Sequence, residues 1–395
     1  MVLRIGFDGA MLRAPHTGSG QYSAALLMAL RAMPDLDIAV FSPELLATEP
    51  AATVIAAPPI LRSARVRKVW WEQFGVGQAA RRAGVAMVHI PYFAAPLWQR
   101  VPHVVTVHDV IPLLFPVYAG GRAIRAYLRL VSIGTRRAAQ VITDSDCSKR
   151  DAIRVLGLDA RRVTAVPLAV EAAFAAVPSD DALATVRARL GLEGKRVIFN
   201  VAGLDVRKNV ETLIRAFARA LPNLPPDVTL VIGGGAHGNA TLYPDPQPLV
   251  RELGIGDRVI FPGPVSAAEK HALYHLAACY VAPSRYEGFG LTPLEAMAAG
   301  MPVIAADASC TPEVVGDAAL LVAPDDIDGF SAALVRVLTD ATLAQRLSEV
   351  GRTRAESFSW ERTAATTRGI YQRAANPPMH ATVLASTDQP AEMTR

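Results

Sequence analysis

Residues 283–303 read PSRYEGFGLTPLEAMAAGMPV and follow an apolar run that ends near Ala282. The run predicts a strand, the glycines after it predict a loop, and Pro293 is well placed at the first position of a helix that stops at Gly300. A helix start preceded by glycines suits a phosphate, because its first N–H groups have no partner within the helix. The N–H groups that we expect to face such a ligand belong to Gly290, Leu291 and Thr292.

The same alternation of short apolar runs and helical patterns extends through the whole chain. Six runs fall in the first half, near residues 2–7, 38–41, 86–90, 104–107, 140–143 and 163–166, and six in the second, near 197–201, 228–232, 259–261, 279–282, 303–305 and 320–322. This rhythm predicts an α/β protein with two Rossmann-like, doubly wound domains, each built on a mostly parallel sheet. Ligands of open α/β sheets bind beyond the carboxyl ends of the strands, so we expect the functional site in a central cleft where the two domains face each other.

Composition argues against several other classes of protein. A chain of 395 residues suits two or three domains, and 51% hydrophobic with 19% charged residues is too apolar for a disordered chain. The formal net charge of +4 is too small to indicate a nucleic-acid-binding protein, and three cysteines without a C-x-x-C pair argue against a disulfide scaffold or a structural zinc site. The first apolar run is broken by Arg4, and no run reaches the roughly 18 apolar residues of a membrane span. We therefore expect a soluble, cytoplasmic protein.

Two carboxylates, Glu287 and Glu295, flank the glycine-containing loop. One precedes the loop and the other lies in the first turn of the predicted helix, so both are candidates to contact one ligand. Two plainer interpretations stay open: Thr292 and Glu295 have the spacing of a capping box, and Glu287 is compatible with an ordinary loop carboxylate.

The whole stretch resembles the signature of retaining glycosyltransferases with the GT-B fold, in which two glutamates stand eight positions apart. Glu287 and Glu295 match both glutamates, and the letters EGFG and EAM that begin at them match the surrounding pattern. The resemblance implies a nucleotide-diphosphate sugar as co-substrate. It assigns Glu295 to the ribose hydroxyls, and Glu287 with the backbone of Phe289 and Gly290 to the hydroxyls of the sugar.

The second domain carries an adjacent pair of cations, Arg207 and Lys208, between the run at 197–201 and an amphipathic helical pattern over 210–220. Two cations at the end of a strand neutralise a diphosphate leaving group as its charge develops. The resemblance implies this role for both residues. The alternative for an isolated Arg-Lys pair is a solvated surface.

Two segments of the first domain extend the resemblance. His108 follows the run at 104–107, and in similar transferases a histidine at this place contacts the donor sugar. Gly18 and Gly20 follow the first run and precede a helix, and similar enzymes use this loop near the donor phosphates and the acceptor. The alternatives are a structural histidine and an ordinary turn between strand and helix.

Two further segments have compositions that could suit a ligand or a membrane. Residues 233–238 read GGGAHG, but polar residues and prolines follow over 239–248 instead of a helix, so this is not a fingerprint for NAD. Residues 60–73 mix cations with Trp70 and Trp71; local packing of the tryptophans with solvated cations is favoured over contact with an anionic membrane. A second basic helix face, which stays undecided, carries Arg122, Arg125 and Arg129.

The resemblance runs from the first strand to a final helix over 358–374, which in this family returns to pack on the first domain. It implies an acceptor-side domain over 1–172 and a domain that binds the nucleotide sugar over 173–357, divided in the stretch 170–181. A tail over 375–395, poor in large apolar residues, is predicted to be disordered.

The expected function is transfer of a sugar from a nucleotide-diphosphate sugar to a glycan or lipid-linked acceptor, with retention of configuration. The order of motifs is most similar to bacterial mannosyltransferases of polysaccharide biosynthesis, so GDP-mannose is the expected donor. We expect no further cofactor, no nucleic-acid partner and no metal, because Arg207 and Lys208 neutralise the leaving group and no acidic D-x-D cluster stands out. Peripheral contact with the inner face of the membrane stays allowed. The alternatives are a sugar-nucleotide epimerase of the same architecture and a non-catalytic nucleotide-sugar-binding protein.

Overall fold

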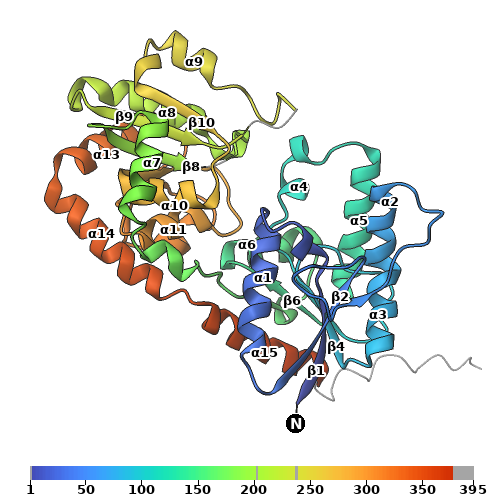
Figure 1. Cartoon of the computed structure of the whole chain (residues 1–395). Helices are drawn as coiled ribbons and strands as arrows, with labels where there is room; N and C mark the ends of the chain where they lie inside the picture. The colour runs from blue at the N-terminus through green and yellow to red at the C-terminus, as the bar shows by residue number, and fades with distance from the viewer. Residues whose placement is uncertain (1, 202, 236–238, 377–395) are drawn as a thin grey trace, which may run out of the picture.

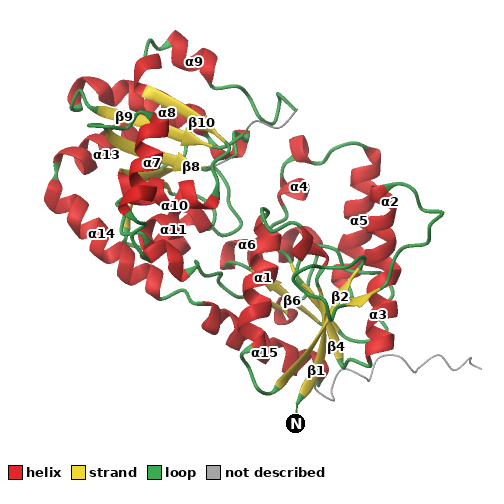
Figure 2. Ribbon diagram, in the orientation of Figure 1, coloured by secondary structure: helices red, strands yellow, loops and turns green. Residues whose placement is uncertain are grey.

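The computed structural model describes residues 2–201, 203–235 and 239–376. This part of the chain forms two parallel β-sheets, each flanked by helices (Figures 1 and 2). The predicted α/β architecture is therefore confirmed.

The strands are β1 (Leu3–Asp8), β2 (Leu36–Ser42), β3 (Thr53–Val54), β4 (Met87–Ile90), β5 (His103–Thr106), β6 (Gln140–Thr143), β7 (Val163–Ala165), β8 (Arg196–Val201), β9 (Val228–Gly233), β10 (Val259–Gly263), β11 (Ala277–Ala282), β12 (Val303–Ala306) and β13 (Ala319–Val322). The α-helices are α1 (Gly18–Arg31), α2 (Ala64–Trp70), α3 (Val76–Ala83), α4 (Ile111–Leu114), α5 (Arg122–Arg136), α6 (Asp146–Leu156), α7 (Asp180–Leu190), α8 (Val210–Ala220), α9 (Gln247–Glu252), α10 (Ala267–Leu276), α11 (Leu291–Ala298), α12 (Thr311–Val315), α13 (Ile327–Thr339), α14 (Ala341–Glu356) and α15 (Trp360–Ala375).

The first sheet has the order β3-β2-β1-β4-β5-β6-β7, and all of its neighbouring strands are parallel. Helices α1 and α15 lie on one side and α3 and α5 on the other (Figure 1). Strands covered on both faces carry apolar residues on both, because both faces exclude water: the neighbouring residues Val104 and Val105 of β5 point to opposite faces and are both buried. The two-residue strand β3 was missed, because its apolar run around Val54 and Ile55 is short and leads into Pro58 and Pro59.

The second sheet has the order β10-β9-β8-β11-β12-β13 and is also parallel. Helices α8 and α13 contribute buried side chains to the cluster on one face of the sheet, and α7, α10 and α11 to the cluster on the other. The order of the strands reverses between β8 and β11, so the loops after these two strands open at the crevice where ligands of such sheets bind.

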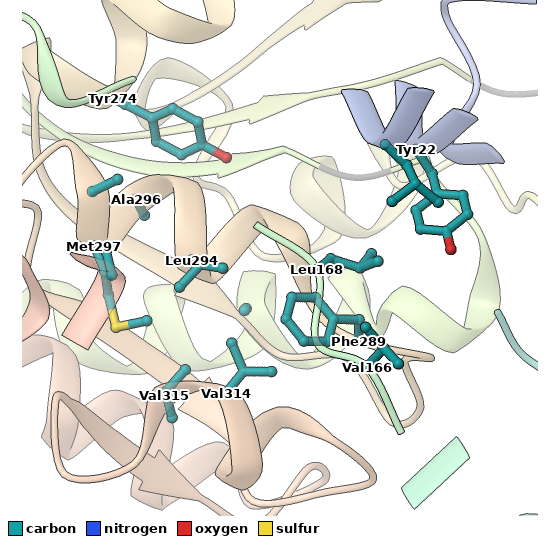
Figure 3. Packing of buried hydrophobic residues seen from close by; sticks show 14 of the residues in the cluster. Tyr22, Val166, Leu168, Tyr274, Phe289, Leu294, Ala296, Met297, Val314 and Val315 are labelled. Atoms are coloured by element: carbon teal, nitrogen blue, oxygen red, sulfur yellow. The ribbon is translucent and has the colours of Figure 1, made fainter. Parts of the chain in front are cut away.

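The last helix, α15, returns to the first sheet, as the resemblance implied. Its Tyr371 hydroxyl lies 2.7 Å from Nδ1 of the buried His89 in β4, and Thr363 donates to the carbonyl oxygen of Pro167. One apolar cluster joins the two sheets: Phe289 of the motif lies beside Val166 and Leu168 of the connecting segment (Figure 3). The predicted tail lies almost entirely outside the described residues, since α15 ends at Ala375.

One local prediction is wrong, and one interpretation that stayed open is excluded. Helix α11 begins at Leu291 rather than at Pro293, because Gly290 takes a left-handed conformation with φ of 100° and ends the loop one residue before Leu291. No side chain caps its first turn, so the capping box between Thr292 and Glu295 does not form. After β9, residues 239–246 form loops and turns, and α9 starts only at Gln247; residues 236–238 of the glycine-rich segment lie outside the described residues.

Candidate functional site

Three predicted residues meet at the point where the second sheet reverses its strand order. Arg207 and Lys208 end the turn after β8, and Glu287 lies in the loop after the neighbouring strand β11. Nη1 of Arg207 lies 2.9 Å from one oxygen of Glu287, and Nζ of Lys208 lies 2.6 Å from the other. All three side chains are less than 20% exposed, so the cluster is a partly buried ion triad rather than a solvated basic pair.

The two cations decide the charge of Glu287. Burial alone would raise the pKa of this carboxyl, but Lys208 and Arg207 outweigh burial and hold the pKa at about 2. Glu287 is therefore ionised at any pH near neutrality and neutralises part of the positive charge.

The position of Arg207 is fixed by backbone contacts as well. Its Nη1 donates to the carbonyl oxygen of Tyr286 at 2.6 Å, and its own N–H donates to the Asp205 carboxylate at 2.8 Å. Its buried Nε–H has no hydrogen-bond partner among the described atoms.

His108 follows β5 of the first sheet and lies at the same junction between the domains. Its Nδ1 lies 2.8 Å from Oδ2 of Asp144, its Nε2 lies 3.2 Å from the carbonyl oxygen of Pro91, and the ring of Tyr22 packs edge-on at 4.7 Å. Burial lowers the pKa of His108, but the Asp144 carboxylate outweighs burial, so the pKa lies above its ordinary value.

The loop that carries Glu287 is bound directly to the first domain. The carbonyl oxygen of Gly288 accepts hydrogen bonds from the hydroxyls of Ser145 and Ser148, each at 2.8 Å. The Tyr286 hydroxyl donates to Asp151 at 2.7 Å, also on α6. The signature loop and the start of α6 therefore form a contact across the cleft.

Glu295 lies in the first turns of α11 but contacts a different set of residues. One of its oxygens accepts from Nζ of Lys270 at 2.8 Å and the other from the hydroxyl of Tyr274 at 2.9 Å, both on α10. Burial raises the pKa of Glu295, and Lys270 and Tyr274 offset only part of that rise. The carboxylate faces a small cavity of about 70 Å³ between the domains, which Gln21 and Tyr22 also line.

The remaining predicted residues have mixed environments. Packing requires glycine at position 20, because a Cβ on Gly20 would lie 2.1 Å from the carbonyl oxygen of Ala14. A Cβ on Gly18 would meet nothing within 4 Å. The Phe289 ring is buried and its carbonyl oxygen accepts from the Cys310 thiol. Gly290 is the N-cap of α11, and Leu291 and Thr292 are its first two residues.

Three residues that contact the predicted site residues were missed in the sequence analysis. Asp144 follows β6 directly, as His108 follows β5, and that shared position is a signal that could have identified it. Lys270 and Tyr274 share a face of α10, but nothing in their spacing links them to Glu295, which lies at least 21 positions away. Among the described residues, no group of three His, Cys, Asp or Glu side chains is arranged to hold a metal ion.

Comparison with known families gives two matches that together span most of the chain. Residues 184–354 match the family model "Glycosyl transferases group 1", and residues 16–174 match "Glycosyltransferase Family 4". The boundary between the two matches falls between the two sheets.

Curated relatives agree with these matches. The chain is 31% identical over 322 residues to the MMP alpha-(1->4)-mannosyltransferase of Mycolicibacterium hassiacum, which covers 80% of this chain and 74% of the relative. It is 28% identical over 286 residues to the O-antigen chain mannosyltransferase B of Escherichia coli, covering 72% and 73% of the two chains. The D-inositol 3-phosphate glycosyltransferase of Kineococcus radiotolerans is 30% identical over 303 residues, covering 72% and 69%.

Solved structures share the fold. Sucrose-phosphate synthase from Thermosynechococcus elongatus aligns with a TM-score of 0.71 at 23% identity, over 94% of this chain and 98% of the other. The Anabaena protein HepE in complex with UDP and glucose aligns with a TM-score of 0.71 at 20% identity, over 94% and 99%. With its two parallel-sheet domains and its paired glutamates, the chain belongs to the group 1 glycosyltransferases of the GT-B fold.

Proposed function

We propose that this glycosyltransferase moves mannose from GDP-mannose to a glycan or lipid-linked acceptor and retains the anomeric configuration. The observation that carries the proposal is the triad of Arg207, Lys208 and Glu287 beyond β8 and β11. Two cations fixed at the crevice of a parallel sheet suit the diphosphate of a nucleotide sugar.

In this mechanism the diphosphate binds Arg207 and Lys208, the two cations that pair with Glu287 in the structure. Arg207 offers its guanidinium group and Lys208 its ammonium group, so negative charge that develops on the leaving phosphate is stabilised as the glycosidic bond breaks. The N–H groups at the start of α11 add to this stabilisation. A metal ion is not needed for this step when two cations are already in place.

The rest of the donor is held by residues on both sides of the cleft. Glu295 accepts hydrogen bonds from the ribose hydroxyls, and Glu287 with the backbone near Gly290 holds the hydroxyls of the sugar. His108 approaches the sugar from the first domain. The acceptor enters on the face of the leaving group, which gives retention, and contact between α6 and the signature loop keeps water from hydrolysing the donor.

Mannose as the sugar is supported by the relatives. Two of those described above are named as mannosyltransferases, at 31% and 28% identity. GDP-mannose is the nucleotide sugar that we propose as the donor of this mannose.

A lipid-linked acceptor is supported by one basic face of the first domain. Helices α2 and α5 lie together, joined by a hydrogen bond from Lys68 to the Tyr127 hydroxyl. Residues 56–71 and 110–143 contain no Asp or Glu. The exposed arginines of this face are Arg62, Arg65, Arg67, Arg122, Arg125 and Arg129.

Apolar side chains are exposed on the same face. Ile60, just before α2, is 85% exposed, Val66 is 49% exposed and Ile124 is 50% exposed, whereas Trp71 is buried and its Nε1–H donates to Asp8. Cations interspersed with exposed apolar side chains favour the surface of an anionic membrane. No helix in the described part of the chain is long and apolar enough to cross a membrane.

A thermal-shift panel with UDP-, GDP- and ADP-sugars tests the donor. GDP-mannose is expected to raise the Tm of the wild type, and the rise is expected to disappear in Arg207→Ala and Glu295→Ala. Arg215→Ala is the matched control, because it removes an exposed arginine that pairs with Glu211 on α8. A rise in Tm with UDP- or ADP-sugars alone would show that GDP-mannose is not the donor.

A product assay then separates transfer from the alternatives. Incubation with GDP-mannose and a mannosylated glycan or lipid extract is expected to give a longer product, whose new linkage has the anomeric configuration of the donor by NMR. Conversion of the donor without an acceptor would identify an epimerase. Binding without any conversion would identify a non-catalytic protein.

A further inference from the structure

His108, which follows β5, is held between two acceptors that follow the strands on either side of β5. Pro91 follows β4, His108 lies two residues after β5, and Asp144 follows β6. Nδ1 lies 2.8 Å from Oδ2 of Asp144, and Nε2 lies 3.2 Å from the carbonyl oxygen of Pro91. The side chain of Asp144 is 4% exposed and that of His108 is 20% exposed.

These two contacts define the protonation state of the ring. A carbonyl oxygen only accepts hydrogen bonds, so Nε2 carries a hydrogen toward Pro91. The proton between Nδ1 and Asp144 stays on the imidazole, since imidazole is a stronger base than a carboxylate. His108 is therefore an imidazolium, and Asp144 is its counter-ion.

We infer that Asp144 is a positioning residue, which keeps His108 doubly protonated and so holds its Nε2–H as a fixed donor for a hydroxyl of the donor sugar. The bond from Nε2 to Pro91 is longer than the usual 2.9–3.0 Å for N–H···O, so a sugar hydroxyl can compete for this hydrogen. The role in transfer rests on the proposed function, whereas the charge state of His108 does not.

The other groups that face His108 do not replace Asp144. From the same loop, Asp109 accepts from the N–H of Ile111 and also faces Arg207 of the second domain. From β4, His89 is neutral, since burial and the charge of His108 lower its pKa to about 3. From α1, Tyr22 presents only its ring.

Among the described residues, the structure gives the Asp144 carboxylate one cationic partner, His108. Its second oxygen, Oδ1, is buried and receives no hydrogen bond from any described atom. A buried carboxylate with one partner depends strongly on that partner, so the two charges stabilise each other.

NMR titration of histidine-labelled protein tests the charge state without substrate. The His108 signal is assigned by its loss in His108→Gln. In the wild type we expect it to titrate above the ordinary pKa of about 6.5. In Asp144→Asn, which keeps the shape but removes the charge, the midpoint is expected to fall by about one pH unit or more.

Asp109→Asn is the matched control, because it removes a nearby carboxylate that does not bond to His108, and a smaller shift is expected. A wild-type His108 that titrates at or below the ordinary value would overturn the inference. This result needs no variant, so it holds even if Asp144→Asn folds poorly. An unchanged midpoint in a folded Asp144→Asn would overturn it as well.

Kinetics test the role in transfer. In Asp144→Asn, kcat/KM with the donor identified by the panel is expected to fall about tenfold at neutral pH. The alkaline limb of the pH profile of kcat/KM is expected to move to lower pH in Asp144→Asn, together with the NMR midpoint of His108. Asp144→Glu is expected to restore both the pH profile and the midpoint. A loss that is equal at every pH would show that Asp144 only supports the fold. If no donor is turned over by the wild type, the proposed function fails, and the titration still decides the charge state.

Discussion

The hydroxyl of Ser145, at the start of α6 in the first domain, donates a 2.8 Å hydrogen bond to the carbonyl oxygen of Gly288 in the signature loop of the second domain. Ser148 donates to the same oxygen. A Cβ on Gly288 would lie 2.5 Å from the carbonyl oxygen of His108, which is too close for any real side chain. The two domains can therefore make this contact only with glycine at this position.

Gly288→Ala is expected to push the signature loop away from the first domain. The triad and the donor site of the second domain stay intact, so we expect GDP-mannose binding to persist while kcat/KM for transfer falls at least about tenfold. Steady-state kinetics beside calorimetric binding measure the two effects. Gly77→Ala is the control, since a Cβ at this position of α3 meets nothing within 4 Å. Wild-type turnover in Gly288→Ala would contradict a catalytic role for the contact.

Glu287→Gln is expected to lower the stability of the protein in a pH-dependent way. The pKa of Glu287 is lowered from 4.5 to about 2, so its ion pairs stabilise the fold above about pH 4.5 and the stabilisation is lost as pH falls toward 2. At pH 7 we expect the variant to lose about 2–3 kcal/mol in the free energy of unfolding, because two largely buried cations lose their partner.

Urea denaturation at pH 7, 5 and 3 measures this difference, which should shrink at the lowest pH. Glu211→Gln breaks an exposed pair in which the carboxylate is 65% exposed, and should change the free energy of unfolding by less than about 1 kcal/mol. Equal losses in both variants, or a loss at Glu287 that does not vary with pH, would contradict the ion-triad account.

Much of the fold is predictable from the sequence because parallel strands covered on both faces need continuous apolar runs. All twelve predicted runs correspond to strands, and among the strands of the described residues only β3, with Thr53 and Val54, was missed. The junction at Arg207 and Glu287 follows from the same rule, since the loops after neighbouring strands meet at one edge of the sheet.

The partners of Glu295 were not predictable in this way. Lys270 and Tyr274 reach it through the packing of α10 on α11, a tertiary contact for which local spacing gives no signal. The capping box that stayed open as an alternative for Glu295 does not form for the same reason, because a partly buried ammonium and a phenol hydroxyl bind this carboxylate instead of its own backbone. Asp144 could have been predicted, since it directly follows β6, which lies beside β5, the strand that His108 follows.

Lys270→Met is expected to weaken donor binding, and more so at low pH. Burial raises the pKa of Glu295, and Lys270 counteracts that rise, so without Lys270 more of the carboxyl is neutral near pH 6. We expect Kd for GDP-mannose to rise about tenfold at pH 6 and less at pH 8, by calorimetry. Lys270→Arg keeps the charge and should bind nearly as the wild type. Equal affinity of Lys270→Met and the wild type across this pH range would show that Lys270 does not act on the ligand through Glu295.

The basic face of α2 and α5 is expected to bind anionic vesicles. The double variant Arg65→Glu with Arg125→Glu reverses two exposed charges on this face, and we expect co-sedimentation with phosphatidylglycerol vesicles to fall several-fold, because each cation near such a surface contributes about 1 kcal/mol. Arg187→Glu with Arg346→Glu makes the same change in charge on α7 and α14 of the second domain and should leave sedimentation near the wild-type level.

Zwitterionic vesicles should retain little protein in every case, and raised salt should release the wild type, since the attraction is electrostatic. If both double variants lose binding equally, net charge rather than this face governs the attraction. If the wild type does not sediment with anionic vesicles at all, the acceptor must reach the cleft in soluble form.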